Sequence, residues 1–282
     1  MQFDASTCAI FSFSASAGRF ILLRVTLSVV IIAYNEEANI GRTLESVKPL
    51  VADGRGEVIV VDSGSTDRTV EIARSFGAKV FIEPWKGYAA QKNSAIEKAT
   101  GDWILSLDAD EEVSPQLAGS VVAITSRELK EVRGYYISRQ NFFLDRWIRH
   151  GGFWPDRKLR LFRRGEAFFE DRTVHEDAIT KQPTAVVQVG TLIHHSYPTL
   201  SDYINHMNHY SSLGAEMTVN QGKRGFSLVN IVLRPWLTFI YNYFFRLGFV
   251  DGREGLLLHL YHAVYVSWKY AKAWELSRKS TT

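Results

Sequence analysis

Two nearly uninterrupted apolar runs restrict the fold of this chain more than any other feature. Residues 25–33 (VTLSVVIIA) and 57–61 (EVIVV) are rich in β-branched side chains. Such runs are typical of strands buried on both faces of a parallel sheet. Apolar residues at helical spacing follow each run, in residues 40–47 and 70–76. We therefore expect an α/β fold in which a mostly parallel sheet is flanked by helices.

Polar clusters stand directly after three of the expected strands. They are residues 34–36 (Tyr-Asn-Glu), 62–67 (Asp-Ser-Gly-Ser-Thr-Asp) and 108–110 (Asp-Ala-Asp). The carboxyl ends of parallel strands meet at one edge of a sheet, and ligands bind there. No Gly-x-Gly-x-x-Gly follows the first strand, and the sequence has no P-loop. A dinucleotide site and a Walker-type nucleotide site are therefore excluded.

Asp108 and Asp110 end an apolar segment, residues 103–107. Side chains two residues apart on an extended backbone point to the same side, so the two carboxylates converge. Converging carboxylates repel each other unless a cation lies between them, and oxygen ligands of this kind suit Mg²⁺ or Mn²⁺. The alternative is a strand-to-helix turn in which Asp110 or Ser114 caps the next helix. Both interpretations fit this stretch alone.

The composition is that of an ordinary globular protein, with 46% hydrophobic and 22% charged residues. The single cysteine, Cys8, excludes an internal disulfide framework and is typical of a reducing compartment. In residues 1–24, Arg19 and Arg24 follow the apolar stretch, whereas a secretory signal carries its positive charge first. We expect residues 1–24 to be a poorly ordered extension.

The C-terminal part of the chain is basic and rich in aromatic residues. Residues 221–282 contain nine Lys/Arg against three Asp/Glu, although the whole chain has a net charge of only +3. Residues 226–246 reach the length of a membrane span, but Arg234 and Pro235 interrupt them, and a charge at a helix centre costs roughly 2.5–3.5 kcal/mol. We therefore expect residues 226–246 and 256–268 to form an interfacial helix pair. A helical lid packed on the domain is the alternative.

Four segments together resemble the family 2 glycosyltransferases, which have the GT-A fold. They are, in the family's order and spacing, VVIIAYNE (29–36), VVDSGSTD (60–67), residues 87–95 and LDAD (107–110). The resemblance covers roughly residues 25–195, with Ala33 in place of the usual proline. It implies a GT-A domain over residues 25–198, followed by a helical, membrane-associating region over residues 199–282.

The resemblance implies a nucleotide-sugar donor. Tyr34, Glu36 and Asp62 would hold the uracil and the ribose, and Lys92 would lie near the donor phosphates. Asp108 and Asp110 would bind those phosphates through Mg²⁺ or Mn²⁺, because a diphosphate leaving group needs its developing charge neutralised. The full set of implied donor contacts is Tyr34, Asn35, Glu36, Asp62, Ser65, Asp67, Lys92 and Asp108.

Within the family, the chain is most similar to the lipopolysaccharide core β-1,4-glucosyltransferases. The segments that carry this similarity are residues 154–162, 174–176 and 195–197. An inverting transfer needs one carboxylate to deprotonate the acceptor hydroxyl. The resemblance gives this role to Glu176, with Asp177 as an accessory residue or the alternative base. His195, or its neighbour His194, would be a third metal ligand, and a purely structural histidine is the alternative.

Residues 139–164 are basic and carry interleaved aromatic side chains. We expect a loop region over the site that offers stacking surfaces and anion contacts to a phosphorylated sugar acceptor. The acceptor contacts would come from Trp154, Arg157 and Arg160. A solvated basic face is the alternative.

The resemblance therefore implies an inverting, metal-dependent transferase that moves a hexose, glucose from UDP-glucose, onto a lipopolysaccharide core or related lipid-linked saccharide. It would act at the cytoplasmic face of the cytoplasmic membrane, with no nucleic-acid partner. The alternatives are a polyprenyl-phosphate sugar synthase of the same fold and a sugar-nucleotide-binding module without activity. Glu111 and Glu112 have no expected role.

Overall fold

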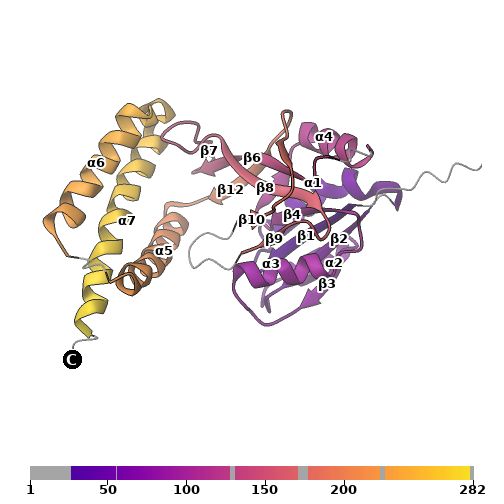
Figure 1. Ribbon diagram of the computed structural model, residues 1–282, viewed down its shortest axis with the longest axis horizontal. Helices are drawn as coiled ribbons and strands as arrows, with labels where there is room; N and C mark the ends of the chain where they lie inside the picture. The colour runs from indigo at the N-terminus through magenta and orange to yellow at the C-terminus, as the bar shows by residue number, and fades with distance from the viewer. Residues whose placement is uncertain (1–26, 55, 128–130, 171–176, 223–225, 280–282) are drawn as a thin grey trace, which may run out of the picture.

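A strand-rich part and a helical part follow each other along the longest axis of the molecule (Figure 1). The structure is a computed structural model that describes residues 27–279 apart from residues 55, 128–130, 171–176 and 223–225. The expected extension, residues 1–24, therefore lies outside the described residues. The described strands lie between Leu27 and Tyr197, and the described elements from Leu200 onward are helical.

The first four strands form the parallel half of a ten-stranded sheet. Their spatial order is β3 (Lys79–Ile82), β2 (Gly56–Asp62), β1 (Leu27–Ala33) and β4 (Trp103–Asp108). The register places Ala33 beside Asp62 and Ile32 beside Asp108. The three polar clusters expected at strand ends therefore meet at one edge of the sheet.

Beyond β4 the sheet is mixed. The order continues through β8 (Asp156–Arg163), β6 (Gly134–Phe143), β12 (Leu192–Tyr197) and β5 (Glu111–Val113). β8 runs antiparallel to both β4 and β6, whereas β12 is parallel to β6. Two short strands, β7 (Arg146–Trp147) and β11 (Thr184–Val186), also pair with β6. Two others, β9 (Phe168–Phe169) and β10 (Ala178–Ile179), pair with each other. The α/β class is confirmed, and the parallel arrangement is limited to the first half of the sheet.

Helices cover both faces of the sheet, which explains why β1 is apolar throughout (Figure 1). Val29 and Ile31 pack in one cluster with α1 (Ile40–Val51) and α4 (Pro115–Thr125). Val30 points to the opposite face and packs with α3 (Tyr88–Glu97). The short α2 (Thr69–Ser75) lies beside α1, which ends in the turn η1 (Ala52–Gly54).

The segment after Asp110 combines features of both sequence interpretations of it. β5 follows directly, and the next helix starts only at Pro115. Ser114 caps that helix by accepting a hydrogen bond from the Leu117 amide, whereas Asp110 caps nothing there. A helix N-cap and a pair of convergent carboxylates therefore coexist, because a three-residue strand separates them.

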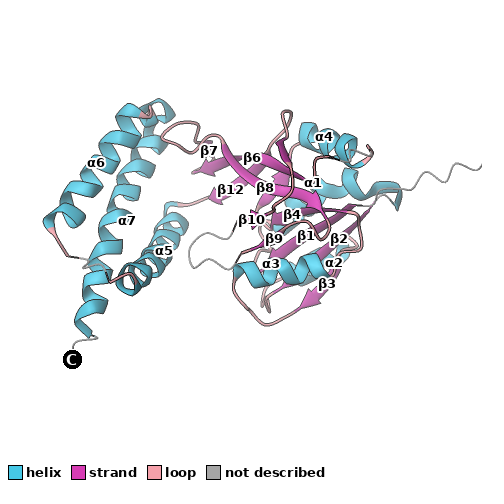
Figure 2. Ribbon diagram, in the orientation of Figure 1, coloured by secondary structure: helices cyan, strands magenta, loops and turns pink. Residues whose placement is uncertain are grey.

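The expected C-terminal helices are present (Figure 2). α5 (Leu200–Asn220) and a bent helical run both pack against the long α7 (Gly252–Lys279). The bent run consists of η2 (Val229–Leu233), α6 (Arg234–Ile240) and η3 (Tyr241–Phe245), and the turn η4 (Gly248–Asp251) joins it to α7. η2 and η3 are π-helical turns, and the first of them precedes Pro235, where the proline removes one backbone donor.

The helical part is tied to the sheet through one buried carboxylate. Asp251 accepts hydrogen bonds from the Arg149 amide (3.1 Å), the His150 amide (2.8 Å) and His150 Nδ1 (2.9 Å). Beside it, burial lowers the pKa of His259 to about 4. These contacts fix α7 against the loop after β7. The domain boundary at residues 198/199 stays a prediction.

Candidate active site

A cavity of about 910 Å³ opens at the carboxyl ends of the parallel strands. Seven of the residues expected in the site line it: Tyr34, Glu36, Lys92, Asp108, Asp110, Arg160 and Asp177. His194, the alternative to His195 as metal ligand, also lines it, and further walls that were not expected come from Trp85, Tyr88, Arg139, Tyr197, His206, His209 and Tyr210. The cavity therefore combines strand-end residues with residues from the C-terminal helices.

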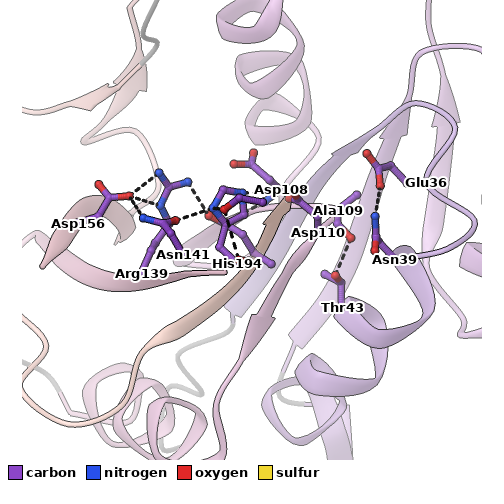
Figure 3. Close-up of polar contacts among 12 residues, drawn as sticks. Glu36, Asn39, Thr43, Asp108, Ala109, Asp110, Arg139, Asn141, Asp156 and His194 are labelled. Carbon is purple, nitrogen blue, oxygen red and sulfur yellow. Dashed lines mark hydrogen bonds and ion pairs between the residues drawn. The ribbon is translucent and has the colours of Figure 1, made fainter. Parts of the chain in front are cut away.

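The backbone of the Asp108–Asp110 segment is held from two sides. Thr43 of α1 donates a hydrogen bond from its hydroxyl to the Ala109 carbonyl (2.7 Å). Glu111 accepts a bond from the Asp108 amide (3.0 Å). Figure 3 shows Thr43 on one side of the segment and His194 on the other. The two carboxylates thus emerge from a backbone that is fixed before any ligand binds.

Asp108 is paired with two cations. Lys92 Nζ lies 2.9 Å from one carboxylate oxygen and Arg160 Nη2 lies 2.6 Å from the other. Burial alone raises the pKa of Asp108, but the charges of Arg160 and Lys92 outweigh this effect and hold the pKa well below its ordinary value. Asp108 is therefore an ionised carboxylate whose charge is already neutralised.

Glu111, which had no expected role, joins Asp108 to a buried ionic network. Its side chain is fully buried and accepts bonds from Arg160 (2.8 Å) and Arg139 (3.1 Å). Arg139 continues to Asp156 at 2.6 Å (Figure 3). Three cations, including Lys92, therefore face three carboxylates. Arg160, expected to contact the acceptor, instead supports Asp108 from within this network.

Asp110 faces His194, whose ring orientation suits a metal ligand. Asn141 donates from its amide nitrogen to Asp156 (3.1 Å), so its oxygen faces His194 Nδ1 at 2.7 Å and can accept a hydrogen bond from it, while the Ser196 hydroxyl lies 2.8 Å from the same nitrogen. The opposite nitrogen, Nε2, lies 3.2 Å from the Asp110 carboxylate. When Nδ1 carries the proton of a neutral ring, Nε2 and the Asp110 carboxylate oxygen are both hydrogen-bond acceptors. A cation between these two atoms satisfies both. The Asp110–His194 pair therefore fits a divalent ion.

The expectation that His195 binds the metal is not supported by its position. Successive residues of a strand point to opposite faces, and on β12 His194 faces the cavity while His195 faces away. His195 Nε2 lies 2.7 Å from Glu112, and its ring stacks on Phe142. Among the described residues no cluster of three or more His, Cys, Asp or Glu is arranged as a metal site. Asp110 and His194 would thus leave most coordination positions to other ligands.

Four of the expected donor contacts hold the strand-end loops together. Asp62 is fully buried and accepts bonds from the Gly64 amide (2.9 Å) and the Ser65 amide (2.8 Å). Asn35 has a φ of 53°, and its side-chain oxygen accepts a hydrogen bond from the Thr66 backbone amide (2.8 Å). The backbone amide of Asn35 donates to the Ser65 hydroxyl. Asp67 likewise accepts from the Glu37 and Thr69 amides. These four side chains shape the cavity edge but do not line the described part of the cavity.

Tyr34 and Glu36 do reach the cavity. Tyr34 is 57% exposed and offers a ring at the edge. Burial raises the pKa of Glu36 to about 7, and nearby Asp110 adds to this shift, although a bond from Asn39 opposes it. At neutral pH Glu36 is therefore partly protonated and can donate a hydrogen bond as well as accept one.

We predict that Glu36→Gln raises the free energy of unfolding of the metal-free protein by about 1–3 kcal/mol at pH 8 and leaves it unchanged at pH 4.5. The pKa of Glu36 is higher in the folded than in the unfolded state, so its ionisation costs stability progressively as pH rises from 4.5 through 7. Glutamine removes this cost. Thermal unfolding in EDTA at both pH values measures the difference. Glu37→Gln, on an exposed neighbour, is the control, and an equal gain there contradicts the prediction.

The remaining expected residues divide between the cavity and its surroundings. Asp177 lines the cavity and is held by Lys158 Nζ at 2.7 Å. Glu176, the expected base, lies outside the described residues. Trp154 packs edge-on against Trp147 (5.2 Å), and Arg157 points to solvent from β8. Neither of these two lines the described part of the cavity, so their acceptor roles stay predictions.

Two cavity residues missed by the sequence reasoning lie between the end of β3 and the first turn of α3. Trp85 and Tyr88 are both substantially exposed and pack edge-on at 4.7 Å. They add an aromatic surface beside the strand-end loops. Their exposure was not predictable from composition, although their place directly after the third strand put them at the binding edge.

The comparisons with known proteins agree with this geometry. Residues 28–180 match the sequence model of Glycosyl transferase family 2. An uncharacterized glycosyltransferase of Rickettsia typhi is 34% identical over an alignment of 269 residues that covers 90% of this chain and 88% of that protein. A lipopolysaccharide core biosynthesis glycosyltransferase of Rhizobium meliloti is 29% identical over 258 residues, 89% of this chain and 93% of that protein.

A solved structure of similar fold covers nearly the whole chain. The mannosyltransferase of Pyrobaculum calidifontis, in complex with GDP-Man and Mn²⁺, matches with a TM-score of 0.52 at 15% identity, over 88% of this chain and 86% of that one. The expected GT-A fold is confirmed. With the strand-end cavity, the family match and these relatives taken together, the chain belongs to glycosyl transferase family 2 and is a glycosyltransferase.

Proposed function

We propose that this enzyme transfers a hexose, glucose from UDP-glucose, with inversion onto a lipid-linked saccharide such as a lipopolysaccharide core. The observation that carries this proposal is the Asp110–His194 pair, which lies in the same cavity as Lys92 and fits a divalent ion. The family membership and the Rhizobium meliloti relative support the sugar-transfer chemistry and the class of acceptor.

Each side chain of the metal motif would act on the donor diphosphate in a different way. Mg²⁺ or Mn²⁺, when bound, supplies positive charge that neutralises the leaving diphosphate. Asp110 and His194 would hold the ion from the protein side. Lys92 lies 2.9 Å from Asp108 and would leave that carboxylate to pair with a phosphate of the bound donor instead. Asp108, released from Lys92, would then complete the ion's ligands.

We assign the base role to Glu176, and Asp177 is the alternative. The base must deprotonate the acceptor hydroxyl on the side of the sugar opposite the diphosphate. Asp177 is held by the ammonium group of Lys158 at 2.7 Å, so its carboxylate is already engaged in an ion pair. This contact supports Asp177 as an accessory residue.

The assignment predicts that Glu176→Gln lowers the transfer rate by about 100- to 10,000-fold without changing UDP affinity. Release of UDP from several UDP-sugars, with Mn²⁺ and a heptose-containing core oligosaccharide, measures the rate, and calorimetric titration measures the affinity. Asp177→Asn is the matched variant, expected to lose far less activity. If only Asp177→Asn is inactive, Asp177 is the base. Transfer to polyprenyl phosphate in place of the oligosaccharide favours the alternative synthase.

We further propose that the bent helical run over residues 228–245 rests on an anionic membrane surface. Large apolar side chains are exposed along it, among them Leu233, Trp236, Leu237, Tyr241, Phe244 and Phe245. The exposed Arg234 lies in this run, and the exposed Arg246 follows it directly. No described helix is both long enough and apolar enough to cross a bilayer. An aromatic face with nearby arginines suits the interface between lipid headgroups and acyl chains.

Replacing Leu233, Trp236 and Leu237 together with serine should abolish binding to phosphatidylglycerol vesicles. Apolar insertion and headgroup attraction are additive, so the wild type should bind, and added salt should weaken its binding. Flotation with vesicles measures both effects. The control replaces two exposed apolar residues of the sheet part, Ile82 and Phe168, with serine. Equal loss in the control, or none in the triple variant, contradicts the assignment of this face.

A further inference from the structure

One wall of the cavity comes from α5, outside the segment that matches the family. His206, His209 and Tyr210 of α5 line the same cavity as Asp108 and Asp110. The family match ends at residue 180, so these side chains lie beyond the part of the chain that the family model matches. The transfer step proposed above uses none of them.

The three side chains form an ordered aromatic surface. Residues spaced three and four apart share one face of a helix, and the His206 ring stacks on Tyr210 with centroids 4.2 Å apart and an interplanar angle of 20°. Tyr197 of β12 meets His206 edge-on at 5.3 Å, and His209 meets Tyr210 edge-on at 5.8 Å. Neighbouring rings thus hold each other in place before a ligand arrives.

Contacts on the other sides of α5 keep this surface in position. Tyr203 is buried and packs edge-on against Phe143 (5.3 Å) and Tyr197 (4.9 Å). Lys272 of α7 donates to the Asn208 carbonyl and to the Ser211 hydroxyl, both at 2.7 Å. Figure 1 shows α5 between α7 and the end of the sheet. The wall is therefore anchored to both parts of the molecule.

The chemistry of this wall suits a sugar ring. A pyranose has an apolar C–H face, which packs on aromatic rings, and a rim of hydroxyl groups, which need hydrogen-bond partners. His209 and Tyr210 carry polar atoms beside the stacked rings, and Lys158 and Asp177 line the same cavity. A nucleobase also stacks on aromatic rings, but Tyr34, Trp85 and Tyr88 already offer rings to it beside the strand-end loops. The α5 wall is therefore available to the other substrate, the saccharide acceptor.

We propose that the His206–His209–Tyr210 face of α5 binds a sugar ring of the saccharide acceptor and sets the acceptor specificity of this enzyme. The proposal rests on the proposed function for the nature of that acceptor. Because α5 is held by α7, the C-terminal helices would have two roles, one toward the acceptor sugar and one toward the membrane.

The test uses a heptose-containing core oligosaccharide that lacks its terminal glucose, freed from lipid. Tyr210→Ala should raise the dissociation constant of this probe, measured by ligand-observed NMR in the presence of UDP and Mn²⁺, by roughly tenfold. The dissociation constant of UDP should not change. Tyr210→Phe keeps the stacked ring and should bind the probe within about twofold of the wild type. Asn205→Ala, on an exposed position of α5 outside the cavity lining, is the matched control.

Three results overturn the proposal: no binding of the probe to the wild type, unchanged binding to Tyr210→Ala, or a UDP affinity that falls as much as the probe affinity. The last result assigns the α5 wall to the donor. Thermal unfolding of each variant shows that the fold is intact. If the wild type binds the oligosaccharide but does not glucosylate it, the proposed function fails, while loss of binding in Tyr210→Ala still supports the α5 site.

Discussion

Replacing Asp110 with asparagine should lower the rate of sugar transfer by about 100- to 1,000-fold. Asp110 lies 3.2 Å from His194 Nε2, and the charge of its carboxylate is what draws a divalent ion to this pair. An amide keeps the shape but removes the charge, so the ion binds weakly and the leaving diphosphate is poorly neutralised. UDP release at several Mn²⁺ concentrations measures the loss. High Mn²⁺ should restore part of the rate.

Adjacent histidines provide the matched control for this assignment. His194→Ala should weaken Mn²⁺ binding in the presence of UDP by about 10- to 100-fold, whereas His195→Ala should leave it nearly unchanged. The two residues are neighbours on β12, but only His194 faces the cavity. Calorimetric titration with Mn²⁺ separates them without a turnover assay. Equal loss of Mn²⁺ binding in both histidine variants, or full activity of Asp110→Asn, would show that Asp110 and His194 do not bind the metal.

Replacing Glu111 with glutamine should destabilise the fold by about 3–5 kcal/mol and lower the melting temperature by roughly 6–15 °C. Glu111 is fully buried and is bonded to both Arg139 and Arg160. Loss of its charge leaves two guanidinium groups with one countercharge fewer in a largely buried network. Arg160 would also shift relative to Asp108, so transfer activity should fall with stability. Differential scanning calorimetry measures the first effect.

Glu112 is the matched control for Glu111. It is the next residue along β5, it is partly exposed, and it contacts His195 on the opposite face of the sheet. Glu112→Gln should change stability by less than about 1 kcal/mol, because a partly exposed pair is screened by water. A Glu111→Gln protein that melts like Glu112→Gln shows that the buried network is not needed for the fold.

The positions of most donor-side residues followed from local patterns. The apolar runs before Tyr34, Asp62 and Asp108 predicted parallel strands, and parallel strands bring their ends to one edge. The side-chain roles followed less well. Asp62 has the expected place beside Ala33, but its carboxylate is bonded to amides of its own loop. A strand-end aspartate that holds its loop and one that holds a ligand look the same in a sequence.

The sequence by itself determined the α/β architecture, the family and the convergence of Asp108 and Asp110 on one edge. Each of these follows from residue spacing within short segments. At that range the two-residue period of a strand and the period of a helix are enough to predict which side chains share a face. Only the tertiary structure decided that Arg160 and Arg139 share Glu111, that His194 faces the carboxylates, and that α5 closes the cavity. These contacts join residues from 28 to about a hundred positions apart, and their geometry depends on how the mixed half of the sheet and the C-terminal helices pack. The Asp-Ala-Asp segment is therefore a binding site that local sequence places and that distant residues complete.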